Sequence, residues 1–359
     1  MSIPSTSLRF VIVFFILSLV WNLFAAKSPG AHIFGIIKLG ELGIFGWLVS
    51  RHFTKQDIPL FVRTLAISGI VSSILAVWQF VNQSSVGGLW YFIGERSFNL
   101  STIGISTVNF GQQILRSYGA FPHPNLLAFF LLVTVMFGLM RISYEKTLFW
   151  KLLISTSVLF CSVGIFLTFS RVAILLLVSF FFYAIYTKGK RNKRVIWAGI
   201  TGIILVSIFL LPSGFLLRGI DFREELFQQS LLIFQSAPYF GIGLNNFFVH
   251  QAPLIKNISP IIYQPPHNIF VLSLLSLGTL GWWMVPFGFI SAVRAVWEKA
   301  KQFKGELRDF YRSILFLLIS VVVAGMFDHF FLTLEQGQIM LALILGLGFA
   351  RLAGEAGKI

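Results

Sequence analysis

The chain has 359 residues, of which 56% are hydrophobic and only 11% are charged, whereas about 25% of the residues in soluble domains are charged. With a mean hydropathy of +0.83, it carries more apolar surface than one water-soluble core would bury. This excludes a soluble enzyme and a disordered chain, and the single cysteine excludes a disulfide scaffold. The net charge of +15 would favour nucleic acid as a partner of a soluble protein, but in a membrane protein its placement decides its meaning.

Ten apolar runs each approach the length of about 20 residues that a helix needs to cross a bilayer. The runs are continuous and lack the alternation that is typical of membrane β-barrel strands. We therefore expect an all-α polytopic membrane protein, organised as a single membrane domain over residues 1–359. The predicted spans are 10–24, 33–49, 62–81, 126–140, 152–169, 172–186, 195–211, 268–293, 313–327 and 337–352.

Most of the 28 lysines and arginines fall in alternate connections between these spans. The positive-inside rule places those connections in the cytoplasm, so both termini are expected inside and no nucleic-acid partner is implied. The first span has only Arg9 before it and no small residue at the position that precedes a cleavage site, which predicts an uncleaved anchor. The remaining basic residues lie in the membrane or face outward: Lys27, Lys38, Arg96, Arg116, Arg171, Arg218, Arg223 and Lys256.

Two outward segments, 82–122 and 212–267, are long, and loops of such length are usually functional. The second contains a predicted helix with Asp221 as N-cap and Glu224 three residues on, a capping-box arrangement. We expect this helix to lie along the outer membrane interface and to end before Pro238. Its expected apolar face consists of Phe222, Leu226, Phe227, Leu231 and Phe234.

The outward arginines are candidates for binding an anion, because an arginine near hydrocarbon costs roughly 2.5 to 3.5 kcal/mol and is kept mainly where it has a partner. Arg171 lies in the stretch TFSR at 168–171, between two apolar runs. It either meets an anionic substrate or reaches toward lipid phosphate. Arg218 and Arg223 flank the start of the predicted loop helix, where backbone N–H groups favour a diphosphate. The alternative for Arg223 is a weak solvated pair with a neighbouring carboxylate.

His267 is the candidate base, because it follows two prolines at the outer end of a predicted span and stands beside Asn268. Histidine is the side chain best suited to accept a proton from a hydroxyl near neutral pH. Alternatively, His267 is a polar residue with only a structural role. Three other histidines are also candidates for the base: His123, His250 and His329.

The four aspartates, Asp57, Asp221, Asp309 and Asp328, are isolated in the sequence, so no Asp-x-Asp pair is present to hold a divalent ion against a diphosphate. Neither a thiolate nor a His-x-x-x-His spacing indicates zinc. We therefore expect no metal and no cofactor, with arginines neutralising a phosphorylated leaving group. Asp328 and Glu335 are candidates to orient or replace the base. Lys38 and Glu41 can meet on one helix face, which favours a structural lock over a transport pathway.

Several stretches together resemble the O-antigen ligase and polymerase family of bacterial membrane glycosyltransferases. The resemblance covers about residues 119–281, and the N-terminal third is similar only in hydropathy. The stretches are GAFPHPN at 119–125, TFSR at 168–171, Arg223, APYFGIGLNNF at 237–247, PHNIF at 266–270 and LGTLG at 277–281.

The resemblance implies a metal-independent, inverting enzyme of the GT-C-like kind in the bacterial inner membrane. It would transfer a glycan from undecaprenyl diphosphate to an acceptor hydroxyl at the outer face. Its partners would be the glycan donor, a lipid-linked or glycan acceptor and membrane lipids. By position, Arg171 and Arg223 would hold the diphosphate and His267 would activate the acceptor. Five more residues are expected to contact the substrates: Arg218, Asn268, Asn125, Asn246 and Arg116.

Three functions follow from these features. Ligation to a lipid A-core-like acceptor is placed slightly ahead of polymerisation of repeat units, because a single large loop carries the histidine. A transporter or flippase for lipid-linked sugars is the alternative from another class. It predicts charges deep in several spans or broken helices in matching halves, and only Lys38 and Glu41 meet that description.

Overall fold

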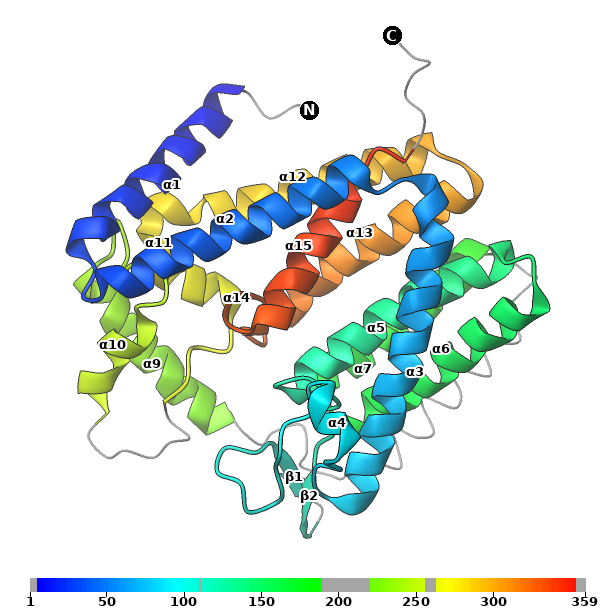
Figure 1. The fold of residues 1–359 in the computed structure, drawn as a ribbon. Helices are drawn as coiled ribbons and strands as arrows, with labels where there is room; N and C mark the ends of the chain where they lie inside the picture. The colour runs from blue at the N-terminus through cyan, green and yellow to red at the C-terminus, as the bar shows by residue number, and fades with distance from the viewer. Residues whose placement is uncertain (1–4, 110, 189–219, 256–262, 353–359) are drawn as a thin grey trace. The chain divides into compact units, whose positions relative to one another are not determined.

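The computed structural model describes residues 5–109, 111–188, 220–255 and 263–352, and these residues form helices with one small sheet (Figure 1). They group into two compact units, each built from segments that are distant in the sequence. The first comprises Met1–Phe53, Gly219–Glu298 and Val321–Arg351. The second comprises Thr54–Arg218, Lys299–Ser320 and Leu352–Ile359.

Helices α2 and α15 pack along each other in the first unit, as do α1 and α11. Gly46 and Gly346 allow the first of these contacts, because a Cβ on Gly346 would lie only 2.6 Å from the carbonyl oxygen of Gly46. The helices of this unit are α1 Ser5–Ala25, α2 Pro29–His52, α9 Ile220–Ser236, α10 Phe247–Gln251, η4 Ala252–Leu254, α11 Ile269–Trp282, α14 Phe330–Thr333 and α15 Glu335–Phe349. Helix α12 Met284–Gln302 belongs to this unit up to Glu298.

Helix α5 is the centre of the second unit, where it packs against α3, α6 and α7. The two-stranded antiparallel sheet of the first outward segment pairs Val108 with Ile114. The elements of this unit are η1 Lys55–Asp57, α3 Ile58–Asn82, α4 Leu89–Phe92, β1 Thr107–Asn109, β2 Gln113–Leu115, α5 Pro124–Arg141, η2 Ile142–Tyr144, α6 Leu148–Leu167 and α7 Arg171–Lys188. Helix α13 Gly305–Gly325 belongs to this unit up to Ser320.

A buried carboxylate ties three parts of the second unit together. The side chain of Glu145 is 1% exposed and accepts hydrogen bonds from Arg63 Nη2 at 2.7 Å and Arg141 Nε at 2.9 Å. Arg141 also pairs with Glu306. Burial raises the pKa of Glu145, but the hydrogen bonds from Arg63 and Arg141 outweigh it, so the pKa is lowered on balance.

Helices cover nine of the ten predicted spans, and the run 195–211 lies outside the described residues. Among the described residues, four helices are long and apolar enough to cross a membrane, or five if a bent pair counts as one span. The prediction of an all-α membrane protein with several spans is therefore confirmed. The count of ten, the two cytoplasmic termini, the single domain and the GT-C-like architecture stay predictions.

The run 268–293, predicted as a span, does not form one straight helix. Helices α11 and α12 are bent by 87° relative to each other, and Gly278 within α11 has a non-helical backbone with φ 67°. Pro286 lies in the first turn of α12, where it lacks a backbone donor and disfavours the helical conformation of the residue before it. The apolar run is long enough for one span, and hydropathy alone does not reveal the break.

The loop helix α9 is present and ends before Pro238, but it begins at Ile220, so Asp221 lies in its first turn rather than at the N-cap. Its buried stripe is Leu226, Gln229, Ser230 and Ile233, spaced as one face of a helix. Two members of the predicted apolar face, Phe227 and Leu231, are instead 49% and 46% exposed. That face is thus only partly correct, because the packed face includes two polar residues. The interfacial position of α9 stays a prediction.

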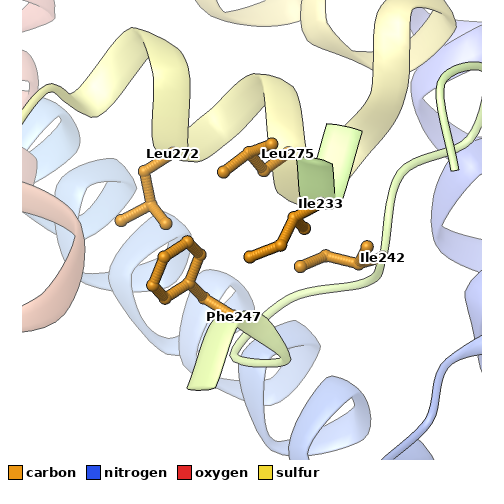
Figure 2. Close-up of a cluster of buried hydrophobic side chains, with 5 residues drawn as sticks. All are labelled: Ile233, Ile242, Phe247, Leu272 and Leu275. Atoms are coloured by element: carbon orange, nitrogen blue, oxygen red, sulfur yellow. The ribbon is translucent and has the colours of Figure 1, made fainter. Parts of the chain in front are cut away.

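Figure 2 shows the apolar cluster that joins the second predicted outward segment, 212–267, which we call the main outward segment, to α11. Its five side chains come from α9, the following loop, α10 and α11, and each is at most 7% exposed. Burying such a side chain contributes roughly 1.5 to 3 kcal/mol. The cluster therefore gives this outward segment a packed core of its own, formed by Ile233, Ile242, Phe247, Leu272 and Leu275.

Candidate functional site

The main outward segment is joined to the break in α11 by backbone hydrogen bonds. Ile242 N and Gly243 N donate to the carbonyls of Leu275 and Ser276, at 2.9 and 3.1 Å. In the other direction, Thr279 N and Leu280 N donate to the carbonyls of Pro238 and Tyr239, at 2.8 and 3.1 Å. We call this arrangement, formed by residues 238–243 and 275–280, the backbone clasp.

The backbone clasp requires glycine at two positions. Gly241 and Gly278 have φ 73° and 67°, and a Cβ on either would collide with backbone atoms of the other segment. These two glycines belong to the stretches APYFGIGLNNF and LGTLG, whose spacing suggested the family resemblance. Because neither glycine has a Cβ, the two chain segments can approach each other closely.

Two polar side chains of α1 donate hydrogen bonds to carbonyl groups of the backbone clasp. The Ser18 hydroxyl lies 2.7 Å from the Phe240 carbonyl oxygen and 2.5 Å from the Leu277 carbonyl oxygen. Asn22 Nδ2 donates to the same Phe240 oxygen at 2.7 Å. The sequence interpretation missed both residues, although polar side chains four positions apart in an apolar helix are a signal that could have found them.

Asn246, expected to bind substrate, is fully buried, and its side chain holds the loop to the start of α2. Its Oδ1 accepts from Ser28 N at 2.8 Å, and its Nδ2 donates to the carbonyls of Ser28 and Leu244 at 3.1 and 2.9 Å. His32 supports the same loop, since its Nδ1 accepts from Leu244 N at 2.8 Å. The amide of Asn246 thus has a structural task, and substrate contact by this residue stays a prediction.

His267 stands where the main outward segment enters α11. Asn268 caps that helix, because its Oδ1 accepts from the backbone N–H groups of Phe270 and Val271 at 2.8 and 3.1 Å. Asn268 Nδ2 also donates to the carbonyl of Met326 at 3.2 Å. One amide therefore fixes both the start of α11 and the turn after α13, and it sets the backbone position of His267.

The turn after α13 brings a carboxylate and a second imidazole to His267. His267 Nδ1 lies 3.8 Å from Asp328 Oδ1, and the rings of His267 and His329 have centroids 5.0 Å apart. Asp328 Oδ1 also accepts from the backbone N–H of His329 at 2.7 Å. Of the residues considered from the sequence, the structure thus gathers three around one point, which we call the histidine cluster: His267, Asp328 and His329.

The histidine cluster is partly buried, with Asp328 buried and the two histidines half-buried. Burial lowers the pKa of His329 to about 4; Asp328 opposes this shift and His267 adds to it. His329 is therefore neutral at pH 7. The Nδ1 atom of His267 is buried and has no hydrogen-bond partner among the described residues, which leaves Nε2 as the nitrogen of His267 that can meet a substrate hydroxyl.

In the second unit, Arg116 joins the two stretches that precede α5 and α7. Its Nε donates to the carbonyl of Thr168 at 2.7 Å, and its Nη2 donates to Asn125 Oδ1 at 2.5 Å. Phe169 has φ 50°, a left-handed backbone that is strained for a bulky residue, and Arg171 begins α7. The structure therefore places the predicted substrate residues Arg116, Asn125 and Arg171 within one neighbourhood.

A buried pair anchors the first outward segment to the end of α3. Glu95 accepts from Gln79 Nε2 and from the backbone N–H groups of Val86 and Gly87, at 2.7 to 2.8 Å. Gln79 Oε1 in turn accepts from the backbone N–H groups of Tyr118 and Gly119. These contacts fix residues 118 and 119 just before the predicted substrate residue Asn125.

The other candidates have simpler surroundings. Arg223 is exposed in the first turn of α9, and Arg218 lies outside the described residues. Lys38 contacts Glu41 Oε2 at 2.9 Å, as predicted, and Glu335 Oε1 at 3.3 Å. Because Glu335 begins α15, this contact connects α2 to α15 and agrees with the interpretation as a structural lock.

Comparison with known proteins gives one family. Residues 156–285 match the family model described as O-antigen ligase, which confirms over this stretch the resemblance found in the sequence. No curated protein matches the chain significantly. The matched stretch contains Arg171, Arg223 and His267, whereas Asp328 and His329 follow it in the sequence.

Proposed function

We propose that the protein transfers a glycan from undecaprenyl diphosphate to an acceptor hydroxyl at the outer face of a bacterial inner membrane, because residues 156–285 match the family model described as O-antigen ligase. We propose a ligase, with a lipid A-core-like acceptor. The observation that supports this proposal best is the placement of His267, whose buried Nδ1 faces Asp328 while Nε2 is left for a substrate.

His267 is the general base of the proposed reaction. The acceptor oxygen attacks the anomeric carbon and forms the new C–O bond, and its proton moves to His267 Nε2. The bond from the anomeric carbon to the diphosphate breaks, and its electron pair leaves with the diphosphate oxygen. This direct displacement inverts the anomeric centre. Asp328, 3.8 Å from Nδ1, orients the ring and stabilises the imidazolium that forms.

Arginines stabilise the departing diphosphate in this proposal. Arg171 and Arg223 offer planar, permanently charged forks that match phosphate oxygens, and this charge replaces a divalent cation, so that transfer proceeds without a metal or a cofactor. Arg116 and Asn125 hold the turn that precedes Arg171. We infer that Arg116 binds the same donor, and that Arg218 and Asn268 line the acceptor side.

Replacing His267 by alanine tests the proposal. The protein is reconstituted in lipid nanodiscs with an undecaprenyl-diphosphate glycan and a lipid-linked saccharide acceptor, and product is measured by mass spectrometry. His267→Ala should lower the rate of transfer by about 10² to 10⁴, the usual contribution of a general base. His250→Ala is the matched control and should retain transfer. Wild-type rates in His267→Ala would remove this residue from the mechanism.

The same assay separates ligation from polymerisation. Supplied with the lipid-linked glycan alone, a ligase gives no longer chains and depends on the added lipid core, whereas a polymerase lengthens its donor. Transfer should persist with a chelator present. Loss of activity that an added divalent cation restores would contradict the metal-free reaction.

A further inference from the structure

The histidine cluster has the composition of a metal site. The ligand atoms of His267, Asp328 and His329 all lie within 4.8 Å of one another. Two imidazoles and one carboxylate suit Zn²⁺, whereas Mg²⁺ and Ca²⁺ prefer oxygen ligands. We propose that these three residues bind Zn²⁺, and that bound Zn²⁺ prevents His267 from acting as the general base.

One distance within the cluster, between His267 and Asp328, is close to that of an occupied site. Zn²⁺ binds histidine nitrogen and carboxylate oxygen at about 2.0 to 2.2 Å in tetrahedral geometry, which sets ligand atoms about 3.4 Å apart. His267 Nδ1 and Asp328 Oδ1 are 3.8 Å apart. They are therefore slightly too far apart for a hydrogen bond and within a few tenths of an ångström of the separation that a shared cation imposes.

His267 supplies an independent indication of a ligand. Its Nδ1 is buried and has no hydrogen-bond partner among the described residues, and buried polar atoms are normally satisfied. A cation between Nδ1 and Asp328 would satisfy the nitrogen and the carboxylate together. The backbone N–H of His329, which donates to Asp328 Oδ1 at 2.7 Å, already holds that carboxylate in place.

Thr333 orients the second imidazole as a metal ligand requires. The Thr333 hydroxyl donates its single proton to the carbonyl of His329 at 3.1 Å. Its oxygen, 2.7 Å from His329 Nδ1, then accepts from Nδ1–H, which leaves the lone pair of this ring on Nε2. A hydrogen bond from the other ring nitrogen is a regular companion of metal-bound histidine.

The effect on transfer rests on the proposed function. A neutral imidazole has one lone pair, and a cation on His267 Nδ1 takes it, so the ring proton must sit on Nε2. Nε2 is then a donor and cannot accept the proton of the acceptor hydroxyl. Zn²⁺ therefore inhibits transfer by fixing the wrong tautomer of His267, and removing it restores the base.

Binding is measured without reference to activity. The full-length protein in detergent is stripped with a chelator, desalted and titrated with ZnCl₂ by calorimetry, and with CoCl₂ by the visible bands of tetrahedral cobalt. We expect one saturable site per chain. His329→Ala should weaken Zn²⁺ binding at least tenfold, and Thr333→Val should weaken it by about 10- to 100-fold, the usual effect of removing a hydrogen bond behind a ligand.

His250→Ala is the matched control, because it removes a histidine outside the cluster and should leave Zn²⁺ affinity unchanged. Size-exclusion profiles and melting temperatures show whether each variant is folded, and Thr333→Val, which alters no ligand, keeps the test decisive if His329→Ala fails to fold. Absence of saturable binding, or equal affinity in wild type, Thr333→Val and His329→Ala, would overturn the site.

The activity arm uses the ratio of transfer rates with and without Zn²⁺ in each protein. This ratio should fall at least tenfold in wild type at saturating Zn²⁺, and the Zn²⁺ concentration that halves it should rise in His329→Ala by the same factor as the affinity falls. Saturable binding in wild type with undiminished transfer would support the cation site and contradict His267 as the base. A failure of the proposed function is thereby distinguished from a failure of the site.

Discussion

The two compact units hold their polar segments by different means. In the first unit the outward segment is joined to α11 by the backbone clasp, in which peptide groups bond to peptide groups around Gly241 and Gly278. In the second unit buried carboxylates do the corresponding work: Glu95 anchors the first outward segment to α3, and Glu145 joins two arginines. The first anchor is made of backbone and the second of ionisable side chains.

This difference predicts what each unit tolerates. Peptide groups do not titrate, so the backbone clasp is insensitive to pH, but it admits no side chain at its two glycines. A carboxylate anchor tolerates neighbours of different size, but it depends on its charge. The following changes test the comparison, from the largest expected effect to the smallest.

Gly278→Ala should have the largest effect. Its Cβ would collide with the carbonyl of Tyr239, and its φ of 67° is strained for alanine. We expect a loss of at least about 4 kcal/mol, seen as a failure to recover monodisperse protein from detergent. The matched control is Gly288→Ala, where nothing lies within 4 Å of the new Cβ. A melting temperature for Gly278→Ala equal to that of the control would break the comparison.

Glu145→Ala should destabilise the second unit by about 3 kcal/mol, because it leaves the partly buried charges of Arg63 and Arg141 without their shared partner. Thermal unfolding in detergent measures this loss. Glu224→Ala, at an exposed position of α9, is the control and should change stability by less than about 0.5 kcal/mol. Equal effects at the two sites would show that the buried network is not an anchor.

Acid should weaken the second unit through the same carboxylate. The pKa of Glu145 is lowered in the folded protein, so the unfolded chain binds its proton first, and the stabilising contribution is lost as pH falls through that lowered pKa. Glu145→Gln should therefore differ from wild type at pH 7 and converge with it in strong acid. Melting temperatures from pH 7 to pH 3 measure this, and a constant difference across the range would contradict the assignment.

Ser18→Ala should have the smallest effect, about 1 kcal/mol, because it removes one hydroxyl from the carbonyls of Phe240 and Leu277 while the backbone clasp stays intact. Ser155→Ala is the control, since that hydroxyl bonds to the carbonyl of Lys151 in its own helix. If Ser18→Ala costs as much as Glu145→Ala, the first unit also depends on side-chain anchors and the comparison needs revision.

The features predicted well from the sequence are those that a short stretch decides by itself. An apolar run of membrane length forms a helix because the helix satisfies its own backbone groups, and the described helices follow these runs. Asn268 was visible as a neighbour of His267, and it caps α11. The contact between Lys38 and Glu41 followed from their spacing on one helix.

The features that were missed depend on segments brought together by folding. Glycine is frequent in membrane helices, so Gly278 gave no sign of a break until Gly241 was seen against it. The aspartates seemed isolated because spacing rules detect only ligands that lie on a single element. Asp328 reaches His267 only through the turn after α13, just as Arg116 meets Thr168 only through the packing of the second unit.

The break in α11 has a consequence for depth in the bilayer. Even without its break at Gly278, a helix of 14 residues would be only about 21 Å long at 1.5 Å per residue, which is less than the hydrocarbon thickness of about 30 Å. If α11 begins at the outer surface, it bends into α12 while still within hydrocarbon, where each unpaired peptide group costs several kcal/mol. The loop 238–243 supplies the partners that Leu275, Ser276, Thr279 and Leu280 need there. The loop therefore replaces the intrahelical hydrogen bonds that the break removes from a membrane helix.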